Sequence, residues 1–194
     1  HDALPISNTA MQLSSRLPKG ALFHMGVSNT RRCWNMFQLP ESVESACNVG
    51  CCGIDGCVST LVGASLVNPD RLCYVVVGDL TFFYDLNSLG NHHIGTNLRV
   101  MLVNNGRGTE FRLGIHHCNV FGDDADKYMA AAGHFGNKSP LLVKHYAEDL
   151  GFHYLSATTK EEFMTALSNF TNPQLSDHSM ILEVFTDSKD ESEA

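Results

Sequence analysis

Continuous apolar runs alternate with amphipathic segments along most of the chain. Apolar runs bounded by polar turn residues are typical of strands buried on both faces of a parallel sheet, and they cover residues 21–28, 72–79, 98–105, 152–157 and 179–186. Apolar residues at helical spacing predict helices over residues 8–17, 56–68, 83–94, 124–133, 139–151 and 159–170. Thr159 precedes Lys-Glu-Glu and is the expected N-cap of the last helix.

Strands that alternate with helices in this way form right-handed β-α-β units. The expected fold is therefore α/β, a doubly wound parallel sheet flanked by helices. Residues 42–56 are rich in glycine and read as a loop. Residues 29–37 also read as a surface loop with one packed aromatic, Trp34. Arg31 and Arg32 leave an anion-binding alternative open for that segment.

Size and charge narrow the function classes. A chain of 194 residues with 43% hydrophobic and 18% charged residues suits one globular domain. The net charge of −8 argues against a nucleic-acid partner, whose binding surface is normally basic. No apolar run has the length of a membrane span and no signal peptide is evident, so we expect no membrane association and a cytoplasmic location.

The ends of the chain read differently from its middle. Residues 1–6, His-Asp-Ala-Leu-Pro-Ile, are the in-frame translation of a common sequencing adapter, so we interpret them as a library scar. The alternative is a genuine irregular N-terminus. Residues 7–187 are then the cofactor-binding domain discussed below, and residues 188–194 are an acidic tail. On the scar interpretation, the chain is a fragment of a longer protein.

Cysteines and histidines do not predict a metal centre. Four of the seven cysteines lie within residues 47–57, but the chain has no Cys-x-x-Cys pair and the cysteine count is odd. Buried free thiols that act as small hydrophobic side chains are the better interpretation. Adjacent histidines, at 92–93 and 116–117, point apart on a helix or strand and cannot chelate as a pair. His116 or His117 remains a candidate for the mouth of a substrate pocket.

Polar residues stand at the ends of two apolar runs. Asp79 ends one predicted strand, and Asn104 and Asn105 end the next. Ligands of doubly wound sheets bind beyond the carboxyl ends of the strands, where the strand order reverses. A carboxylate, an amide oxygen and a backbone carbonyl form a hard oxygen set that suits Mg²⁺, which completes its shell with water and phosphate oxygens. Nearby glycines let the backbone approach a phosphate: Gly78, Gly106 and Gly108. This pattern predicts a magnesium diphosphate site.

The same residues carry a family resemblance. The span 78–105 opens with Gly-Asp and closes with Asn-Asn, and it resembles the diphosphate-binding motif of thiamine diphosphate-dependent enzymes. The run "GDLTFFYDLNSL", with Leu80 where many members have glycine, and the upstream "GIDGCVSTLVGA" are most similar to the menaquinone-pathway synthases of that family. The resemblance covers residues 8–186, as the C-terminal domain of the fold.

The resemblance implies a cofactor site and an activity. It implies that thiamine diphosphate and Mg²⁺ support decarboxylation of a 2-oxo acid, with possible ligation of the product to an acceptor. Asp79 and Asn105 would bind the metal by side chain, and Arg107 by its backbone carbonyl. Ile54, after Gly53, would hold the cofactor in its bent conformation, and Glu110 would lie near the thiazolium. The remaining cofactor contacts implied are Asn8, Thr9, Gly78, Leu80, Thr81, Gly108 and Thr109.

Departures from the family concern the substrate. Val49 stands where the menaquinone-pathway synthases carry an arginine for substrate carboxylates, and Leu13 stands in place of a second arginine. Glu110 replaces an aliphatic residue. These differences favour a related carboligase or decarboxylase with a different acceptor.

Part of the family's site has no counterpart in the chain. In the family a separate N-terminal domain, normally from a second subunit, binds the pyrimidine ring and carries the activating glutamate. The chain alone would then be inactive. The alternative is a non-catalytic or regulatory binding module that keeps the fold without the chemistry.

Overall fold

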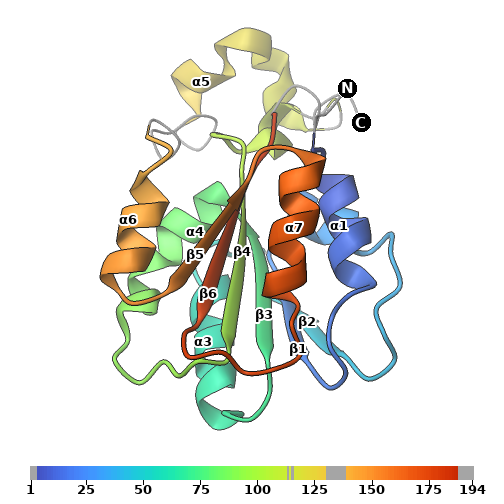
Figure 1. Ribbon diagram of the computed structural model, residues 1–194. Coiled ribbons are helices and arrows are strands. Elements are labelled where there is room, and N and C mark those ends of the chain that lie inside the picture. Colours follow the sequence, from blue (N-terminus) through green and yellow to red (C-terminus); the bar gives the residue numbers. More distant parts are fainter. Residues whose placement is uncertain (1–3, 113, 115, 130–138, 188–194) are drawn as a thin grey trace.

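The computed structural model describes residues 4–112, 114, 116–129 and 139–187. In this part of the chain, six parallel strands form one sheet in the order β2-β1-β3-β4-β6-β5 (Figure 1). The expected α/β doubly wound fold is thereby confirmed. The strands are β1 (Leu22–Met25), β2 (Glu44–Cys47), β3 (Cys73–Gly78), β4 (Leu98–Asn104), β5 (His153–Ala157) and β6 (Met180–Phe185).

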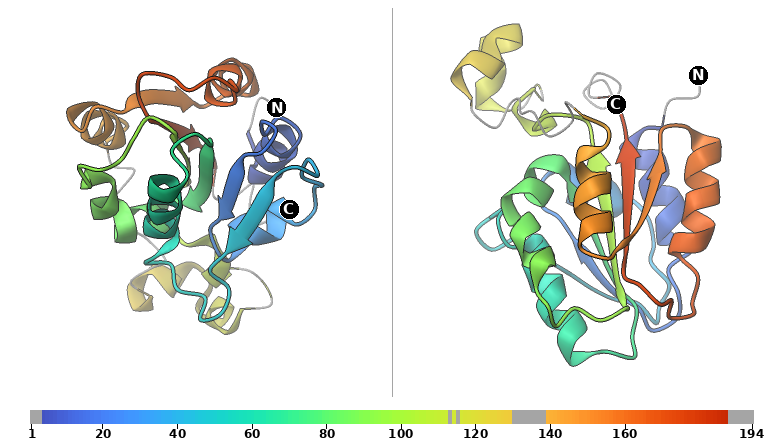
Figure 2. Two further views of the ribbon diagram at one scale, coloured as in Figure 1. Left: turned by 90° about the horizontal axis from the view of Figure 1, so that it is seen from below. Right: turned by 60° about the vertical axis from the view of Figure 1, so that its left-hand side comes forward.

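Helices cover both faces of the sheet. α1 (Ile6–Ser14), α2 (Asn29–Trp34) and α7 (Lys160–Phe170) lie on one face, and α3 (Cys57–Val67), α4 (Asp79–Asp85) and α6 (Leu142–Asp149) lie on the other (Figure 2). The 3-10 helix η1 (Leu86–Gly90) continues α4. Beyond the carboxyl edge of the sheet lie η2 (Thr109–Arg112), η3 (His117–Asp124) and α5 (Ala125–Tyr128) (Figure 1).

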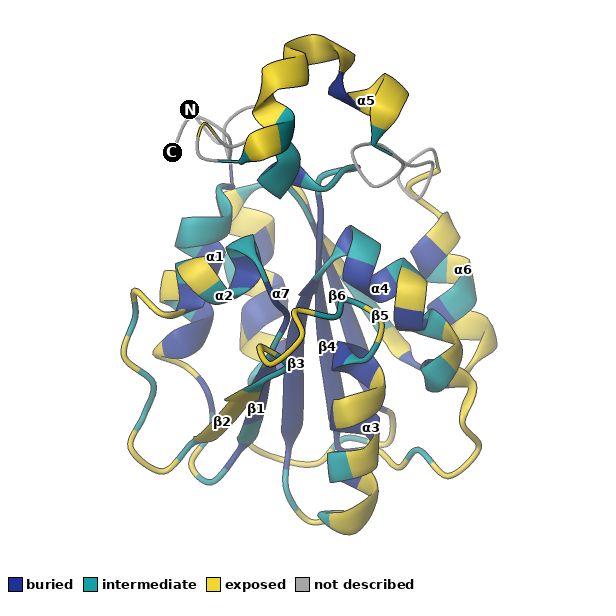
Figure 3. Ribbon diagram, turned by 180° about the vertical axis from the view of Figure 1, so that it is seen from behind, coloured by how far each residue is buried: buried dark blue, intermediate teal, exposed yellow. Residues whose placement is uncertain are grey.

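The central strands are buried on both faces (Figure 3). In β3, Tyr74 and Val76 face a core shared with α1 and α7, whereas Val75 and Val77 face a core shared with α3 and α4. This double burial explains why the strand sequences are continuously apolar. Burying one Val, Leu or Phe side chain contributes about 1.5–3 kcal/mol, so the central strands hold the carboxyl edge of the sheet rigidly in place.

The predicted N-cap of the last helix is confirmed. The Thr159 hydroxyl accepts a hydrogen bond from the Glu162 backbone N–H at 3.2 Å, and the Glu162 carboxylate accepts one from the Thr159 N–H at 3.3 Å. This reciprocal capping box satisfies two of the N–H groups that the first turn of a helix leaves unpaired. It therefore determines where α7 begins.

Two segments differ from their sequence-based interpretation. Residues 29–37 were expected to be a surface loop, but α2 occupies most of them, because Trp34 is only 1% exposed and packs into the core. Residues 42–56 were expected to be a loop, but they contain β2, an edge strand. The helix expected over residues 124–133 is described only as α5, because residues 130–133 lie outside the described part.

The two ends of the chain are only partly described. Residues 1–3 and 188–194 lie outside the described residues. Of the segment interpreted as a library scar, Leu4 is 3% exposed within the core and Ile6 begins α1. This packing does not test where the segment comes from, so its interpretation stays a prediction.

Candidate functional site

A pocket of about 130 Å³ opens at the carboxyl ends of β1, β3 and β4. β1 lies between β2 and β3, so the strand order reverses at its carboxyl end. Doubly wound sheets bind their ligands at this reversal. The pocket therefore occupies the place that the fold itself favours for a ligand.

Asp79 forms part of the pocket wall directly after β3. Its side chain is 3% exposed. One carboxylate oxygen accepts a hydrogen bond from the Leu80 N–H at 2.7 Å, and the other accepts one from the Gly106 N–H at 2.6 Å. Gly106 has a φ of +82°, a conformation that glycine adopts without strain. The turn after β4 thus orients the carboxylate that ends β3.

The two asparagines that end β4 have different positions. Asn105 lines the pocket, and its side-chain oxygen accepts a hydrogen bond from the Arg107 N–H at 3.1 Å. Asn104 is buried and donates to Glu183 at 2.7 Å, and Tyr154 donates to the other Glu183 oxygen at 2.7 Å. Burial raises the pKa of Glu183, and the bonds from Asn104 and Tyr154 oppose that shift. Asn104 therefore supports the turn, whereas Asn105 faces the ligand space.

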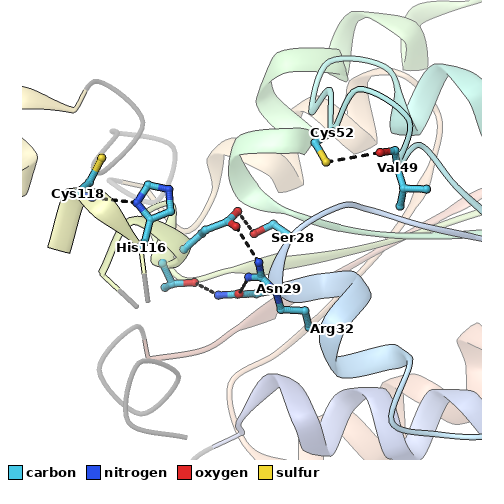
Figure 4. Close-up of polar contacts among 9 residues, drawn as sticks. Ser28, Asn29, Arg32, Val49, Cys52, His116 and Cys118 are labelled. Carbon is cyan, nitrogen blue, oxygen red and sulfur yellow. Dashed lines mark hydrogen bonds and ion pairs between the residues drawn. The ribbon is translucent and has the colours of Figure 1, made fainter. Parts of the chain in front are cut away.

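A third strand end, after β1, contributes polar groups to the pocket that Asp79 also lines, and Figure 4 shows two of them, Ser28 and Asn29. The Asn29 amide donates to the Thr109 hydroxyl at 2.8 Å, and the Ser28 hydroxyl donates to the Glu110 carboxylate. Ser28 has φ +63° and ψ −133°, which costs a residue with a side chain about 1–3 kcal/mol. Strained backbone of this kind clusters at functional sites, which supports a functional role for this strand end.

Glu110 is the centre of a charged cluster at the pocket. Arg32 donates to its other carboxylate oxygen at 2.9 Å. Burial raises the pKa of Glu110, but the bonds from Ser28 and Arg32 and the charges of Arg32 and His116 outweigh it and lower the pKa overall. Glu110 is therefore a carboxylate at neutral pH, able to accept hydrogen bonds and unsuited to act as an acid.

Ile54 reaches the pocket from the loop between β2 and α3. Its side chain is half-buried against the core on the α3 side. On the same loop Cys52 has a φ of +52° and its thiol donates to the Val49 carbonyl at 3.5 Å (Figure 4). Val49, where the resemblance implied an arginine, is exposed and does not line the pocket. Leu13, where it implied a second arginine, is fully buried in the core.

The structure gathers most of the residues singled out from the sequence. Nine of them line the pocket: Ile54, Gly78, Asp79, Leu80, Thr81, Asn105, Arg107, Thr109 and Glu110. Gly53 and Gly108 adjoin lining residues without lining the pocket themselves. Asn8 and Thr9 lie on α1, and the buried Thr9 hydroxyl donates to the Ile6 carbonyl at 2.7 Å. The structure does not bring that pair to the pocket lining.

Sequence reasoning missed the strand end after β1. Ser28, Asn29 and Thr30 line the pocket and were assigned to a strand terminus and a surface loop. The signal was present, because the apolar run of β1 ends in Gly-Val-Ser-Asn, as β3 ends in Gly-Asp. The polar ends of β1, β3 and β4 thus lie on adjacent strands of one parallel sheet.

Cysteines and histidines lie mostly apart from the pocket lining. All seven cysteines are free thiols. Cys57 and Cys73 are buried, as expected, and burial raises the pKa of each to about 11. Cys51 and Cys52 are exposed, so the interpretation as buried hydrophobic side chains is wrong for them. The His92 and His93 rings lie against each other, tilted by 41° with centroids 3.8 Å apart, so the expectation that these adjacent histidines point apart is wrong for this pair.

Neither His116 nor His117 lines the pocket, but His116 contacts the lining residue Phe111. Its ring packs edge-on against Phe111, with centroids 5.2 Å apart, and its Nδ1 accepts the Cys118 N–H at 3.1 Å.

The donor set fits magnesium and a diphosphate. Among the described residues no cluster of three or more His, Cys, Asp or Glu side chains could hold a metal ion. A Mg²⁺ ion does not need such a cluster, since it commonly binds one or two protein oxygens together with water and phosphate oxygens. Asp79 and Asn105 supply carboxylate and amide oxygens, and Thr81 and Thr109 add hydroxyl groups at the same pocket.

No helix within the described residues has the length and apolarity needed to cross a membrane.

Comparisons with known proteins agree with this arrangement. No protein-family model matches the chain. The chain is similar to curated 2-succinyl-5-enolpyruvyl-6-hydroxy-3-cyclohexene-1-carboxylate synthases. It is 35% identical to those of Bacteroides fragilis over 174 residues, of Phocaeicola vulgatus over 179 and of Christiangramia forsetii over 181. These alignments cover 90%, 91% and 93% of the chain and 30% of each relative. The resemblance to the menaquinone-pathway synthases of the thiamine diphosphate family is confirmed, and the chain spans less than a third of their length.

Proposed function

We propose that the chain is the cofactor-binding part of a thiamine diphosphate- and Mg²⁺-dependent enzyme that decarboxylates a 2-oxo acid and ligates the product to an acceptor. One observation carries the proposal. Asp79 and Asn105, the first and last polar residues of the diphosphate-binding motif, line one pocket from the ends of the adjacent strands β3 and β4. The similarity to the synthases supports the same interpretation.

In this proposal the metal is held at the ends of β3 and β4. Asp79 and Asn105 would bind Mg²⁺ through side-chain oxygens, and Arg107 through its backbone carbonyl. The backbone N–H groups of Leu80 and Gly106 orient the Asp79 carboxylate before any ligand arrives. Such pre-orientation lowers the entropic cost of binding, because the ligand set needs little rearrangement.

The remaining residues would hold the diphosphate and the rings. Gly78, Leu80, Thr81, Gly108 and Thr109 are proposed diphosphate contacts, most of them at the pocket wall. Asn8 and Thr9 lie outside the lining, so we assign the polar contact on the β1 side to Ser28 and Asn29. Ile54, positioned by Gly53, would support the bent conformation of the cofactor.

The bound cofactor would supply the carbanion and the electron sink that decarboxylation requires. Glu110 is an ionised carboxylate at the pocket wall, and there it could accept a hydrogen bond from the substrate. The relatives are named for a product with a succinyl group and a ring carboxylate. We propose a different acceptor for this chain, because Val49 and Leu13 stand where arginines were expected.

The pocket of this chain is smaller than a complete cofactor site. It measures about 130 Å³, whereas ligand pockets are typically about 300–1,000 Å³. We propose that a pyrimidine-binding domain, from a longer form of the protein or a second subunit, completes the site and supplies the activating glutamate. Without it the chain would bind cofactor weakly and be inactive. We place the protein in the cytoplasm, with a small-molecule 2-oxo acid as its substrate.

Cofactor protection tests the proposal. The midpoint of thermal unfolding is measured with thiamine diphosphate and Mg²⁺ together, with each alone, and with Ca²⁺ in place of Mg²⁺. We expect stabilisation only when cofactor and divalent metal are both present, since a ligand that binds only the folded state stabilises it by mass action. Asp79→Asn should abolish the stabilisation, and Asp70→Asn, at an exposed site among the amino ends of the strands, should retain it.

Full protection of the Asp79→Asn variant would refute the metal assignment. No protection of the unmodified chain at millimolar cofactor would favour a module that keeps the fold without the cofactor.

A further inference from the structure

Two positive side chains at the pocket are paired with carboxylates of this chain. Arg107 lines the pocket, and its guanidinium lies 3.7 Å from the Asp126 carboxylate. Arg32 borders the pocket from α2 and is paired at 2.9 Å with Glu110, which does line it. At these two positions the chain's own carboxylates therefore already engage the positive charge that an anionic substrate group would need.

The Arg32–Glu110 pair is fixed by more than its own charges. Glu110 is held at both oxygens, because Ser28 donates to one and Arg32 donates to the other. The Asn29 amide of the same segment also bonds to Thr109, directly before Glu110. Three hydrogen bonds thus join α2 and its N-cap Ser28 to η2 (Figure 4). These hydrogen bonds fix the Glu110 carboxylate as part of the pocket wall.

We propose that Glu110 determines substrate specificity by excluding a carboxylate from the Arg32 side of the pocket and favouring a group that donates hydrogen bonds, such as a hydroxyl or an ammonium. This inference rests on the proposed function only in treating the pocket as a substrate site. On this inference, the acceptor has no carboxylate at the end that lies beside Arg32.

Charge and geometry both support this assignment. Arg32 already donates one guanidinium N–H to Glu110 at 2.9 Å and another to the Asn29 side-chain oxygen at 2.8 Å, so its donors are largely engaged within the chain. A second carboxylate beside Glu110 would meet a like charge at contact distance, which is unfavourable in a partly buried site. The side chains of Arg32 and Glu110 are 44% and 33% exposed, so water screens both charges of the pair only in part.

Matched ligands of one shape test the inference on the 194-residue chain without cofactor. Succinate carries two carboxylates, succinamide is its neutral isostere, and 4-aminobutanamide presents an ammonium instead. Binding is followed by ¹⁵N-edited NMR titration of the wild type and of Glu110→Gln, which keeps the size of the side chain and removes its charge. Glu44→Gln is the matched control, because it breaks the exposed Arg71–Glu44 pair at the opposite edge of the sheet.

We expect Glu110→Gln to bind succinate at least about tenfold more tightly than the wild type, with no such gain for succinamide. For 4-aminobutanamide we expect the opposite order of affinities: the wild type should bind it more tightly than Glu110→Gln does. Arg32→Gln added to Glu110→Gln should remove the gain for succinate, and Glu44→Gln should show none.

Equal succinate affinity in wild type and Glu110→Gln, a gain shared by succinamide, or a gain that survives Arg32→Gln would each overturn the inference. The NMR spectrum of each variant also reports its folding, so a misfolded variant is recognised before titration. The variant that combines Glu110→Gln with Arg32→Gln, and the titration with the positively charged 4-aminobutanamide, then still test whether Glu110 excludes a carboxylate. Because no cofactor is present, these outcomes are separate from the thermal protection test of the proposed function.

Discussion

Replacing Gly106 with alanine tests whether the turn after β4 is held by its backbone conformation alone or also by its bond to Asp79. Gly106 and Gly151 have the same φ of +82°, so alanine meets the same left-handed backbone at both positions. A side chain in that conformation costs about 1–2 kcal/mol, partly offset by the lower entropy of the unfolded alanine chain. The backbone effect alone therefore predicts a loss of about 1 kcal/mol for either variant.

Gly106→Ala should cost more than Gly151→Ala. The Gly106 N–H donates at 2.6 Å to the Asp79 carboxylate, which is 3% exposed. A hydrogen bond to a charged group contributes about 1.5–3 kcal/mol, and a distorted turn loses part of it. The Gly151 N–H donates to a helix carbonyl, at Glu148, and a β-carbon there would meet no atom within 4 Å. We expect total losses of about 2–4 kcal/mol for Gly106→Ala and about 1 kcal/mol for Gly151→Ala.

Urea unfolding of the two variants and of Asp79→Ala measures these differences. If the extra cost acts through Asp79, Gly106→Ala should cost only about 1 kcal/mol in the Asp79→Ala background, a coupling of about 1–3 kcal/mol. Gly151→Ala should instead add to Asp79→Ala. Equal losses for the two glycine variants, or strict additivity of Gly106→Ala with Asp79→Ala, would refute the reasoning.

Two further predictions concern the fold around the site. Thr159→Ala removes the capping box of α7 and should cost about 1 kcal/mol in urea unfolding, and a loss no larger than that of Thr165→Ala, in the middle of the same helix, would contradict it. Burial lowers the pKa of His24 below 6.5, against a weaker opposing bond from Asn48. The unfolded chain therefore takes up a proton before the folded chain does, so wild-type stability should fall as the pH drops below about 6.5. His24→Gln should flatten this part of the stability profile, and a profile parallel to the wild type would exclude the assignment.

The ends of β3 and β4 could be predicted from sequence for a local reason. Each strand is buried on both faces, so its residues are apolar until the chain leaves the sheet, apart from the buried Arg99 near the start of β4. A polar residue directly after the apolar run then marks the carboxyl edge. Since parallel strands share that edge, the apolar pattern alone is enough to expect Asp79 and Asn105 at one pocket.

β2 and α2 could not be predicted in the same way. β2 is an exposed edge strand whose position depends on pairing with β1, where Leu22 lies opposite Glu44. No periodic pattern marks such a strand, because one partner and the solvent replace a core. α2 is short, and it is held by the burial of Trp34 in a core made by distant segments. Both elements are products of tertiary packing.

The contact between Arg32 and Glu110 shows what this dependence on packing means for function. The two residues are 78 positions apart, and the sequence places Glu110 near the cofactor and Arg32 in a surface loop with an anion-binding alternative, without relating one to the other. The sequence does not show which cation the Glu110 carboxylate meets. That partner is supplied by α2, a helix whose sequence reads as a loop. The residues expected to hold the cofactor lie mostly at strand ends encoded locally, whereas the pair proposed to select the substrate joins segments that only the folded sheet brings together. We therefore expect sequence motifs to identify the cofactor residues of this chain more readily than the pair of residues proposed to select its substrate.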